Sequence, residues 1–228
     1  MKTISNILAL LLFAASGIAF GQNRERPEVG FVRIVNAVSP GTGKATFFVN
    51  GRNLYADGYA LGQTTGGYGV KAGDLEIEVR KEGVQTGRTN VRLGNGETLT
   101  VIAFAERVPP KKEDDPPMWA IKLLRLKQQD VERGYGVSLV SVCRAEETAV
   151  DLVVEGRERP ERAFARRLNI STVEIGRTRS EIMIRLDDKV IGNISPDSPG
   201  NYVVILYENA DGEIQALSYY DPKFVIAG

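Results

Sequence analysis

Apolar and polar residues alternate along short segments of this chain, which is the pattern of β-strands with one face against a core. Apolar side chains occupy every second position, or nearly so, in residues 31–36 (FVRIVN), 45–50 (ATFFVN) and 75–80 (LEIEVR). Turn sequences rich in Gly, Pro and Asn separate these segments, as at residues 39–43 and at Asn50-Gly51. The pattern therefore predicts half-buried strands joined by tight turns, and an all-β chain.

The same pattern continues toward the C-terminus, where residues 201–207 (NYVVILY) and 213–219 (EIQALSY) flank an Asn-Ala-Asp-Gly turn. This arrangement predicts a β-hairpin. Residues 118–126 (MWAIKLLRL) fit either a short helix or a strand. By analogy with the hairpin of the second half, we predict that they form the closing strand of the first half. The Pro-rich residues 108–117 then form an enlarged hairpin loop.

One stretch of the first half returns in the second. Residues 32–52 (VRIVNAVSPGTGKATFFVNGR) align without a gap with residues 137–157 (VSLVSVCRAEETAVDLVVEGR), and the register extends to the pair Arg80 and Arg185. A repeat of fixed register indicates a duplicated structural unit. We predict two tandem immunoglobulin-like antiparallel β-sandwiches, each of about seven short strands. A single large barrel is the alternative.

The first residues have the features of an export signal. Lys2 precedes an apolar run, and Ala19-Phe20-Gly21 offers small residues for cleavage before Gln22. A membrane anchor would need about 20 predominantly apolar residues, and this run is shorter. We expect an exported protein that is periplasmic, or alternatively extracellular or on the cell surface, with no membrane span after cleavage. The expected divisions are a signal peptide (1–21), a flexible lead-in (22–28), the first sandwich (29–126), a linker (127–136) and the second sandwich (137–228).

Composition narrows the chemistry of the chain. Its 29 Lys and Arg balance 29 Asp and Glu, so no global field favours nucleic acid or an anionic membrane. Histidine is absent, which excludes Ser-His-Asp and Cys-His catalysis and His-ligated zinc. Cys143 is the single cysteine, so it forms no intrachain disulfide, and we expect it to pack as a small hydrophobe. We therefore predict a protein that is not an enzyme and holds no metal or cofactor.

Two pairs of adjacent carboxylates, Asp114-Asp115 and Asp187-Asp188, are candidates for acid–base work or for holding a cation. Both pairs fall in predicted loops or turns beside lysines. No further oxygen ligands follow at the spacing of a calcium loop. We therefore expect these carboxylates to be solvated.

Three tyrosines of the first half, Tyr55, Tyr59 and Tyr68, are candidates for a sugar-stacking platform. Tyr59 aligns with Phe164 in the repeat and Tyr68 aligns with Val173, so we expect these two to lie on core or strand faces. Only Tyr55 lacks an apolar counterpart. The Gly-rich residues 62–69 nearby lie between strands rather than before a helix, so they do not form a phosphate-binding loop.

Arginines concentrate directly after Gly156, in the sequence RERPERAFARR. The guanidinium group binds carboxylates and phosphates in bidentate fashion, so an acidic polysaccharide is a plausible ligand. Glu158 and Glu161 partly neutralise the stretch, and a solvated loop is the alternative. The candidate ligand-binding residues are Arg157, Arg159, Arg162, Arg166 and Arg167.

The series FVRIVNA, FFVNGR, YGVKAGDLEIEVR and GNGETLTVIAF resembles an uncharacterised family of bacterial exported β-sandwich domains that occur in tandem. In its signal peptide, its length and its FVR-x-x-NA and AGD elements near Phe31 and Ala72, the whole chain is also similar to the periplasmic adaptor family of alginate O-acetylation. That resemblance implies a non-catalytic protein that connects the membrane and periplasmic parts of an acetyl-transfer machine.

These observations lead to an expected function. We expect a non-enzymatic exported accessory protein that acts by binding proteins of the cell envelope, acetyl-transfer components among them, or an acidic polysaccharide. An adaptor in exopolysaccharide O-acetylation of the alginate type is its most concrete version. A cell-surface adhesion or carbohydrate-binding module is the alternative, and nucleic acid is not an expected partner.

Overall fold

A computed structural model describes residues 28–109, 118–129, 131, 134–176, 178 and 180–222. Within these residues the regular structure consists of strands, sixteen in number, and includes no helix. The prediction of an all-β chain is therefore confirmed. The predicted signal peptide, nearly all of the lead-in, and Asp114 and Asp115 of the Pro-rich loop lie outside the described residues.

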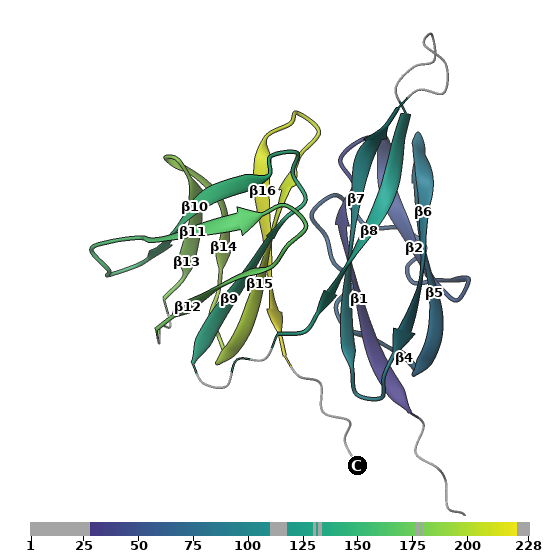
Figure 1. Cartoon of the computed structure of the whole chain (residues 1–228), viewed down its shortest axis with the longest axis horizontal. Coiled ribbons are helices and arrows are strands. Elements are labelled where there is room, and N and C mark those ends of the chain that lie inside the picture. Colours follow the sequence, from purple (N-terminus) through teal and green to yellow (C-terminus); the bar gives the residue numbers. More distant parts are fainter. Residues whose placement is uncertain are drawn as a thin grey trace, which may run out of the picture.

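The first eight strands form one hydrogen-bonded sheet in the order β3-β2-β5-β6-β8-β7-β1-β4. Their bounds are β1 Val29–Ala37, β2 Thr42–Val49, β3 Arg52–Asn53, β4 Tyr68–Lys71, β5 Gly73–Glu82, β6 Val84–Leu93, β7 Thr98–Val108 and β8 Met118–Lys127. A single bridge, between Gln85 and Ala120, joins β6 to β8 in the middle of this order. The sheet therefore consists of two four-stranded layers, β3-β2-β5-β6 and β8-β7-β1-β4, that face each other (Figure 1).

The core of the first half lies between these two layers. It is built from alternate residues of the strands, because successive side chains of a strand point to opposite faces. Ile34 of β1, Phe47 of β2 and Ile77 of β5 belong to this core and are fully buried. The strand β8 pairs with β7 along its whole length, so the prediction of a strand at residues 118–126 is confirmed and the helix alternative is wrong.

The last eight strands form two four-stranded sheets with the orders β11-β10-β13-β14 and β12-β9-β15-β16. Their bounds are β9 Tyr135–Ser141, β10 Glu147–Val154, β11 Glu161–Arg166, β12 Ser171–Ile175, β13 Ile182–Leu186, β14 Lys189–Ile194, β15 Gly200–Glu208 and β16 Ile214–Asp221. A second core, which includes Leu139, Leu152 and Ile184, packs between these sheets. Each half thus has eight strands, one more than expected. In the first half the two-residue β3 is too short to show alternation.

The two halves share one strand order. In both, the first strand pairs in parallel with the seventh and antiparallel with the fourth, as β1 does with β7 and β4, and β9 with β15 and β12. In both, the second strand lies between the third and the fifth. The topology therefore follows the repeat in the sequence. The described turns agree as well, since Asn50 and Gly51 have positive φ angles of 50° and 74° in the tight turn from β2 to β3.

The halves meet through a third apolar cluster, which we call the junction. It lies between the sheets β8-β7-β1-β4 and β12-β9-β15-β16, which face each other across the middle of the molecule (Figure 1). Its buried members are Val35, Ala37, Ile102, Phe104, Leu126, Val140, Val203 and Ile205. The expectation that residues 31–36 are half-buried is therefore wrong for most of the strand: the face of β1 that alternation assigns to solvent is covered by the second half. Sheets buried on both faces contain near-continuous apolar runs, as β7 and β15 do.

Candidate functional site

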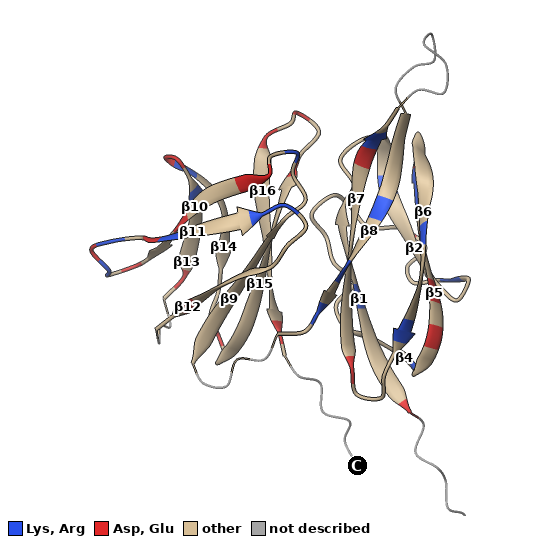
Figure 2. Cartoon of the chain, viewed as in Figure 1, with Lys and Arg blue, Asp and Glu red and all other residues tan. Residues whose placement is uncertain are grey.

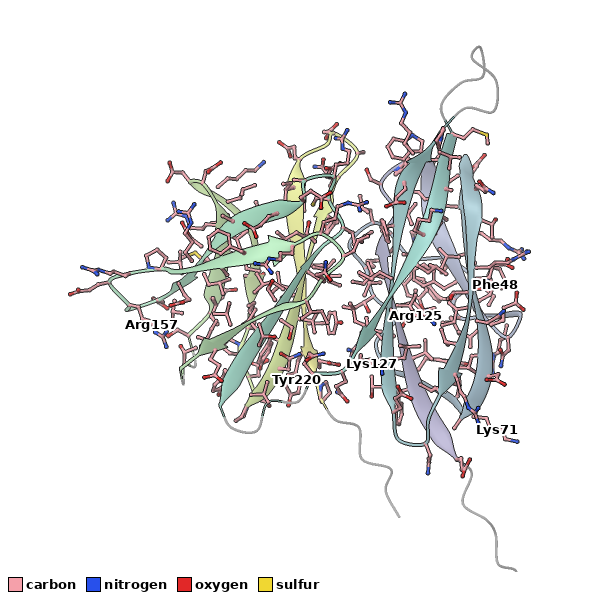
Figure 3. The ribbon with its side chains drawn as sticks, in the orientation of Figure 1. Phe48, Lys71, Arg125, Lys127, Arg157 and Tyr220 are labelled. Carbon is pink, nitrogen blue, oxygen red and sulfur yellow. The ribbon has the colours of Figure 1, made fainter. Side chains whose placement is uncertain are left out.

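The five candidate arginines do not form one cluster. Arg157 and Arg159 lie in the exposed loop between β10 and β11, which projects away from the junction and carries charges of both signs (Figures 2 and 3). The Nη2 atom of Arg157 donates a hydrogen bond of 3.2 Å to the carbonyl oxygen of Gly176. This part of the candidate site is therefore the solvated loop that the sequence offered as the alternative.

Two of the arginines do share a face. Arg162 and Arg166 lie on the solvent side of the edge strand β11, whereas Ala163 and Ala165 between them are buried in the core. Phe164 separates the two arginines on the same outer face, and 46% of its surface is exposed. Arg166 forms an exposed ion pair with Glu147 on β10, with 3.3 Å between Nε and Oε2. We call Arg162, Phe164 and Arg166 the β11 face.

Arg167 points elsewhere. Its guanidinium group forms an ion pair with Glu106 of the first half and donates through Nε to the carbonyl oxygen of Cys143, at 3.1 Å. Arg167 therefore supports the contact between the halves.

The remaining candidates occupy structural positions. Cys143 is 1% exposed and belongs to the core of the second half, and burial raises the pKa of its thiol despite an opposing hydrogen bond with Ser141. Asp187 and Asp188 form the turn from β13 to β14, where Asp188 pairs with Arg185. Among the described residues, no group of three or more His, Cys, Asp and Glu side chains is placed to hold a metal ion.

Of the three candidate tyrosines, Tyr59 packs against the core of the first half and stacks on Phe47, with 4.7 Å between ring centroids. Tyr55 is 49% exposed and makes a T-shaped contact with the Tyr59 ring, with 5.7 Å between ring centroids. Tyr68 is half-buried in β4. The three rings therefore do not make one exposed platform.

The junction holds a buried ion pair that the sequence pattern did not reveal. The Nη1 atom of Arg33, on β1, lies 2.7 Å from Oδ1 of Asp221 at the end of β16, and both side chains are 4% exposed. The guanidinium carbon of Arg33 also lies 4.3 Å from the centre of the Tyr219 ring. Burial raises the pKa of the Asp221 carboxyl, and the charge of Arg33 opposes that shift.

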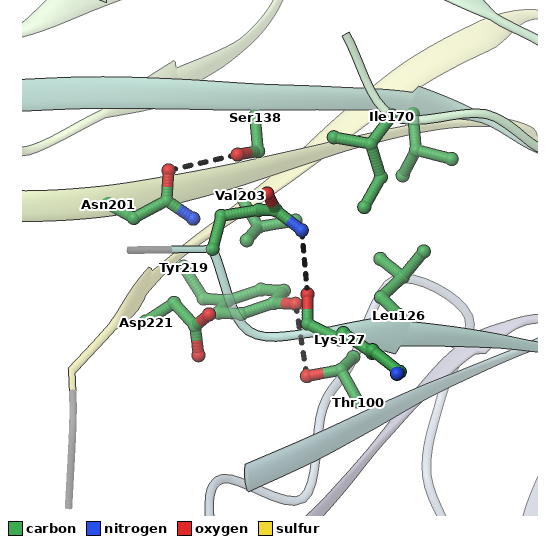
Figure 4. Close-up of a pocket in the computed structure, with 11 residues that line it drawn as sticks. Thr100, Leu126, Lys127, Ser138, Ile170, Asn201, Val203, Tyr219 and Asp221 are labelled. Carbon is green, nitrogen blue, oxygen red and sulfur yellow. Dashed lines mark hydrogen bonds between the residues drawn. The ribbon is translucent and has the colours of Figure 1, made fainter. Parts of the chain in front are cut away.

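A small cavity lined by both polar and apolar side chains adjoins this pair (Figure 4). Its volume is about 10 Å³, close to the least that holds one water molecule. Asn201 presents a buried Nδ2 with no hydrogen-bond partner among the described residues, and Tyr219 donates to the Oγ1 atom of Thr100 at 3.3 Å. Burial also raises the pKa of Tyr219 to about 12, so its ring stays neutral. The cavity suits a structural water better than a ligand.

A larger groove of about 420 Å³ opens at the other end of the junction. Both halves line it, and its residues include Phe104, Trp119 and Pro40 from the first half and Arg144 and Glu208 from the second. The volume falls within the range of about 300–1,000 Å³ typical of ligand pockets. Sequence reasoning missed this groove, because its residues come from distant segments that only the docking of the halves brings together.

No model of a known protein family matches the chain, and no curated protein is significantly similar to it. In the part of the chain that the structure describes, no helix is long and apolar enough to cross a membrane.

Proposed function

We propose that the chain is a non-enzymatic, exported accessory protein that works by binding other components of the cell envelope. An adaptor in the O-acetylation of an alginate-like exopolysaccharide is its most concrete form, with the periplasm as its compartment. We further interpret each half as an immunoglobulin-like sandwich, on the grounds of two facing layers and a single core per half. Within these layers the strands are antiparallel except for one parallel pair in each half, β1 with β7 and β9 with β15.

The observation that carries this proposal is the junction. An adaptor must hold its partners at a constant separation, and a buried apolar contact between domains restricts their relative motion. Here eight buried apolar residues and the Arg33–Asp221 pair fix one half against the other. The outer layers β3-β2-β5-β6 and β11-β10-β13-β14 then lie on opposite sides of the molecule (Figure 1). Each of them offers a partner a separate face.

Deleting the gene tests the adaptor role. We expect the host to make its exopolysaccharide in normal amount but with few O-acetyl groups, and the wild-type gene to restore them. Acetyl content that stays at the wild-type level after deletion would refute the adaptor proposal.

A binding module for acidic polysaccharide is the second candidate, and the β11 face is the observation that favours it. An exposed aromatic ring between two guanidinium groups suits a charged sugar chain, because the ring packs on apolar sugar surface and the arginines bind carboxylates. We expect the variant Arg162→Ala/Arg166→Ala to lose retention on a polyuronate column. The matched control is Arg52→Ala/Arg92→Ala, which removes two exposed arginines from the outer layer of the first half. Equal retention of the two variants would exclude the β11 face.

A further inference from the structure

The groove at the end of the junction has walls that are held in place by hydrogen bonds. Lys81 is 9% exposed and donates through Nζ to the carbonyl oxygen of Val38, at 2.6 Å, which fixes the start of the loop between β1 and β2. Ser39 in that loop donates to the carbonyl oxygen of Asn209 in the β15–β16 turn, at 2.7 Å. The turn itself is closed by Asn209 Oδ1, which accepts from the amide of Glu213 at 2.9 Å. A preformed site of this kind pays little ordering cost on binding.

The lining combines apolar and charged groups. Ala37 and Phe104 lie beneath the groove at the end of the junction cluster, where they are 5% and 4% exposed. The half-buried side chains of Val142 and of Trp119, at the start of β8, supply its accessible apolar surface. Arg144 and Glu208 form an ion pair in the second half, with 2.9 Å between Nε and Oε2. The groove is therefore amphipathic rather than simply hydrophobic.

The ion pair leaves hydrogen-bonding capacity for a ligand. Arg144 uses its Nε and its backbone amide to bind Glu208, and its side chain is 75% exposed. Its Nη2 lies beside Gly212, another lining residue, and donates no hydrogen bond to any described residue. Donors on Arg144 therefore stand next to a carboxylate acceptor on Glu208.

This pairing discriminates between ligand classes. A carboxylate or phosphate would be attracted by Arg144 but repelled by the adjacent Glu208. A hydroxyl group both donates and accepts, so neighbouring hydroxyls of one sugar ring satisfy the two side chains together. The apolar face of the same ring packs on aromatic surface.

We propose that this groove binds a neutral sugar residue, with its hydroxyls on Arg144 and Glu208 and its apolar face toward Trp119. This inference rests on the proposed function, because it takes the chain to be a binding protein of the cell envelope. It uses a surface separate from the β11 face and selects a different class of sugar.

The chain offers a direct probe, because Trp119 is its only tryptophan. Tryptophan fluorescence of the mature chain is followed while neutral oligosaccharides of glucose, mannose and galactose, and oligosaccharides of uronic acids, are added in separate titrations. We expect at least one neutral series to give a saturable change. We expect Arg144→Ala and Glu208→Gln each to weaken that binding about tenfold or more, because the first removes the guanidinium donors and the second replaces a charged acceptor with a weaker neutral one. Arg185→Ala, which removes another arginine paired with a carboxylate of the same half, is the control and should bind as wild type does.

Each outcome decides between the proposals. No change with any neutral series overturns the inference, as does a change with uronic acids alone. Binding that Arg144→Ala and Glu208→Gln leave intact places the sugar elsewhere and also overturns it. The adaptor function is tested separately in the host. If deleting the gene abolishes exopolysaccharide acetylation and a gene encoding Arg144→Ala restores it fully, the adaptor function holds and the groove does not serve it.

Discussion

Arg33 and Asp221 are 188 residues apart in the sequence and form a 2.7 Å ion pair across the junction between the two halves. Few charged side chains are so fully buried unless they are paired. Removing one partner leaves an uncompensated charge in an apolar contact, which costs far more than the pair itself contributes. The pair therefore disfavours any docking of the halves in which Arg33 and Asp221 do not meet.

Replacing Arg33 with Met should lower the free energy of unfolding by about 3–5 kcal/mol, because Asp221 stays buried without its partner. The double variant Arg33→Met/Asp221→Leu should recover most of that loss, since no buried charge remains. Urea unfolding measures both values. Arg166→Ala is the control: its ion pair with Glu147 is exposed, and exposed pairs contribute about 0–1 kcal/mol. A loss in Arg33→Met no larger than in this control would contradict the account.

The loss in Arg33→Met should depend on pH. Burial raises the pKa of Asp221 in the folded chain, and without Arg33 only a hydrogen bond from Gln128 opposes that shift. The folded chain then binds a proton at Asp221 more tightly than the unfolded chain does. As the pH falls through this raised pKa, the stability of Arg33→Met relative to wild type should therefore rise. At pH values above the raised pKa, the full loss of stability should persist.

Urea unfolding at a series of pH values measures this dependence. In the variant Arg33→Met/Asp221→Asn the group that titrates is gone, so the dependence should disappear. A slope that remains in this double variant would assign it to another group.

A side chain at position 62 should destabilise the fold, because Gly62 meets the second half at close range. Its φ angle is +80°, and a Cβ atom there would lie 2.4 Å from the hydroxyl of Tyr207. We expect Gly62→Ala to cost more than Gly66→Ala, which has a φ angle of +69° but no atom within 4 Å of its Cβ position. The backbone strain that both share is about 1–3 kcal/mol. Adding Tyr207→Phe should reduce the extra loss of stability that Gly62→Ala shows in thermal unfolding. An equal loss of stability in Gly62→Ala and Gly66→Ala would show that the contact with Tyr207 does not form.

Cys143 should react slowly with thiol reagents while the chain is folded. The side chain is 1% exposed, and burial raises the pKa of its thiol, so the reactive thiolate is scarce. Labelling followed by absorbance should be slow at neutral pH and become fast in denaturant. Fast labelling of the folded chain would mean that the core of the second half opens readily.

The sequence predicted the elements of the fold better than their arrangement. Alternation located the strands around Phe47 and Ile77, and the repeat anticipated that β9 would have the same neighbours as β1. Alternation also placed Arg33 on a solvent face, which is wrong, because a period of two does not tell water from a second protein layer. The continuous apolar run of β7 carried that information, since only a strand covered on both faces needs one.

For the candidate sites, too, the sequence predicted which residues share a strand face but not which segments meet in space. The sequence brought Arg162 and Arg166 to one strand face, because residues two positions apart on a strand share a side. It also grouped them with Arg167, which alternation already places on the other side of that strand's end and which binds Glu106 of the first half. The groove at Trp119 and Arg144 has no local signature, because the two residues belong to different halves.

The account depends most on the claim that the junction makes the two halves one cooperative body. Differential scanning calorimetry of the mature chain tests it directly. The account predicts one transition whose calorimetric enthalpy equals its van't Hoff enthalpy. The double variant Arg33→Met/Asp221→Leu should also show a single peak, with a midpoint close to that of wild type, because the apolar cluster still joins the halves. Two separate transitions in the wild-type chain would show that the halves unfold independently, and would contradict it.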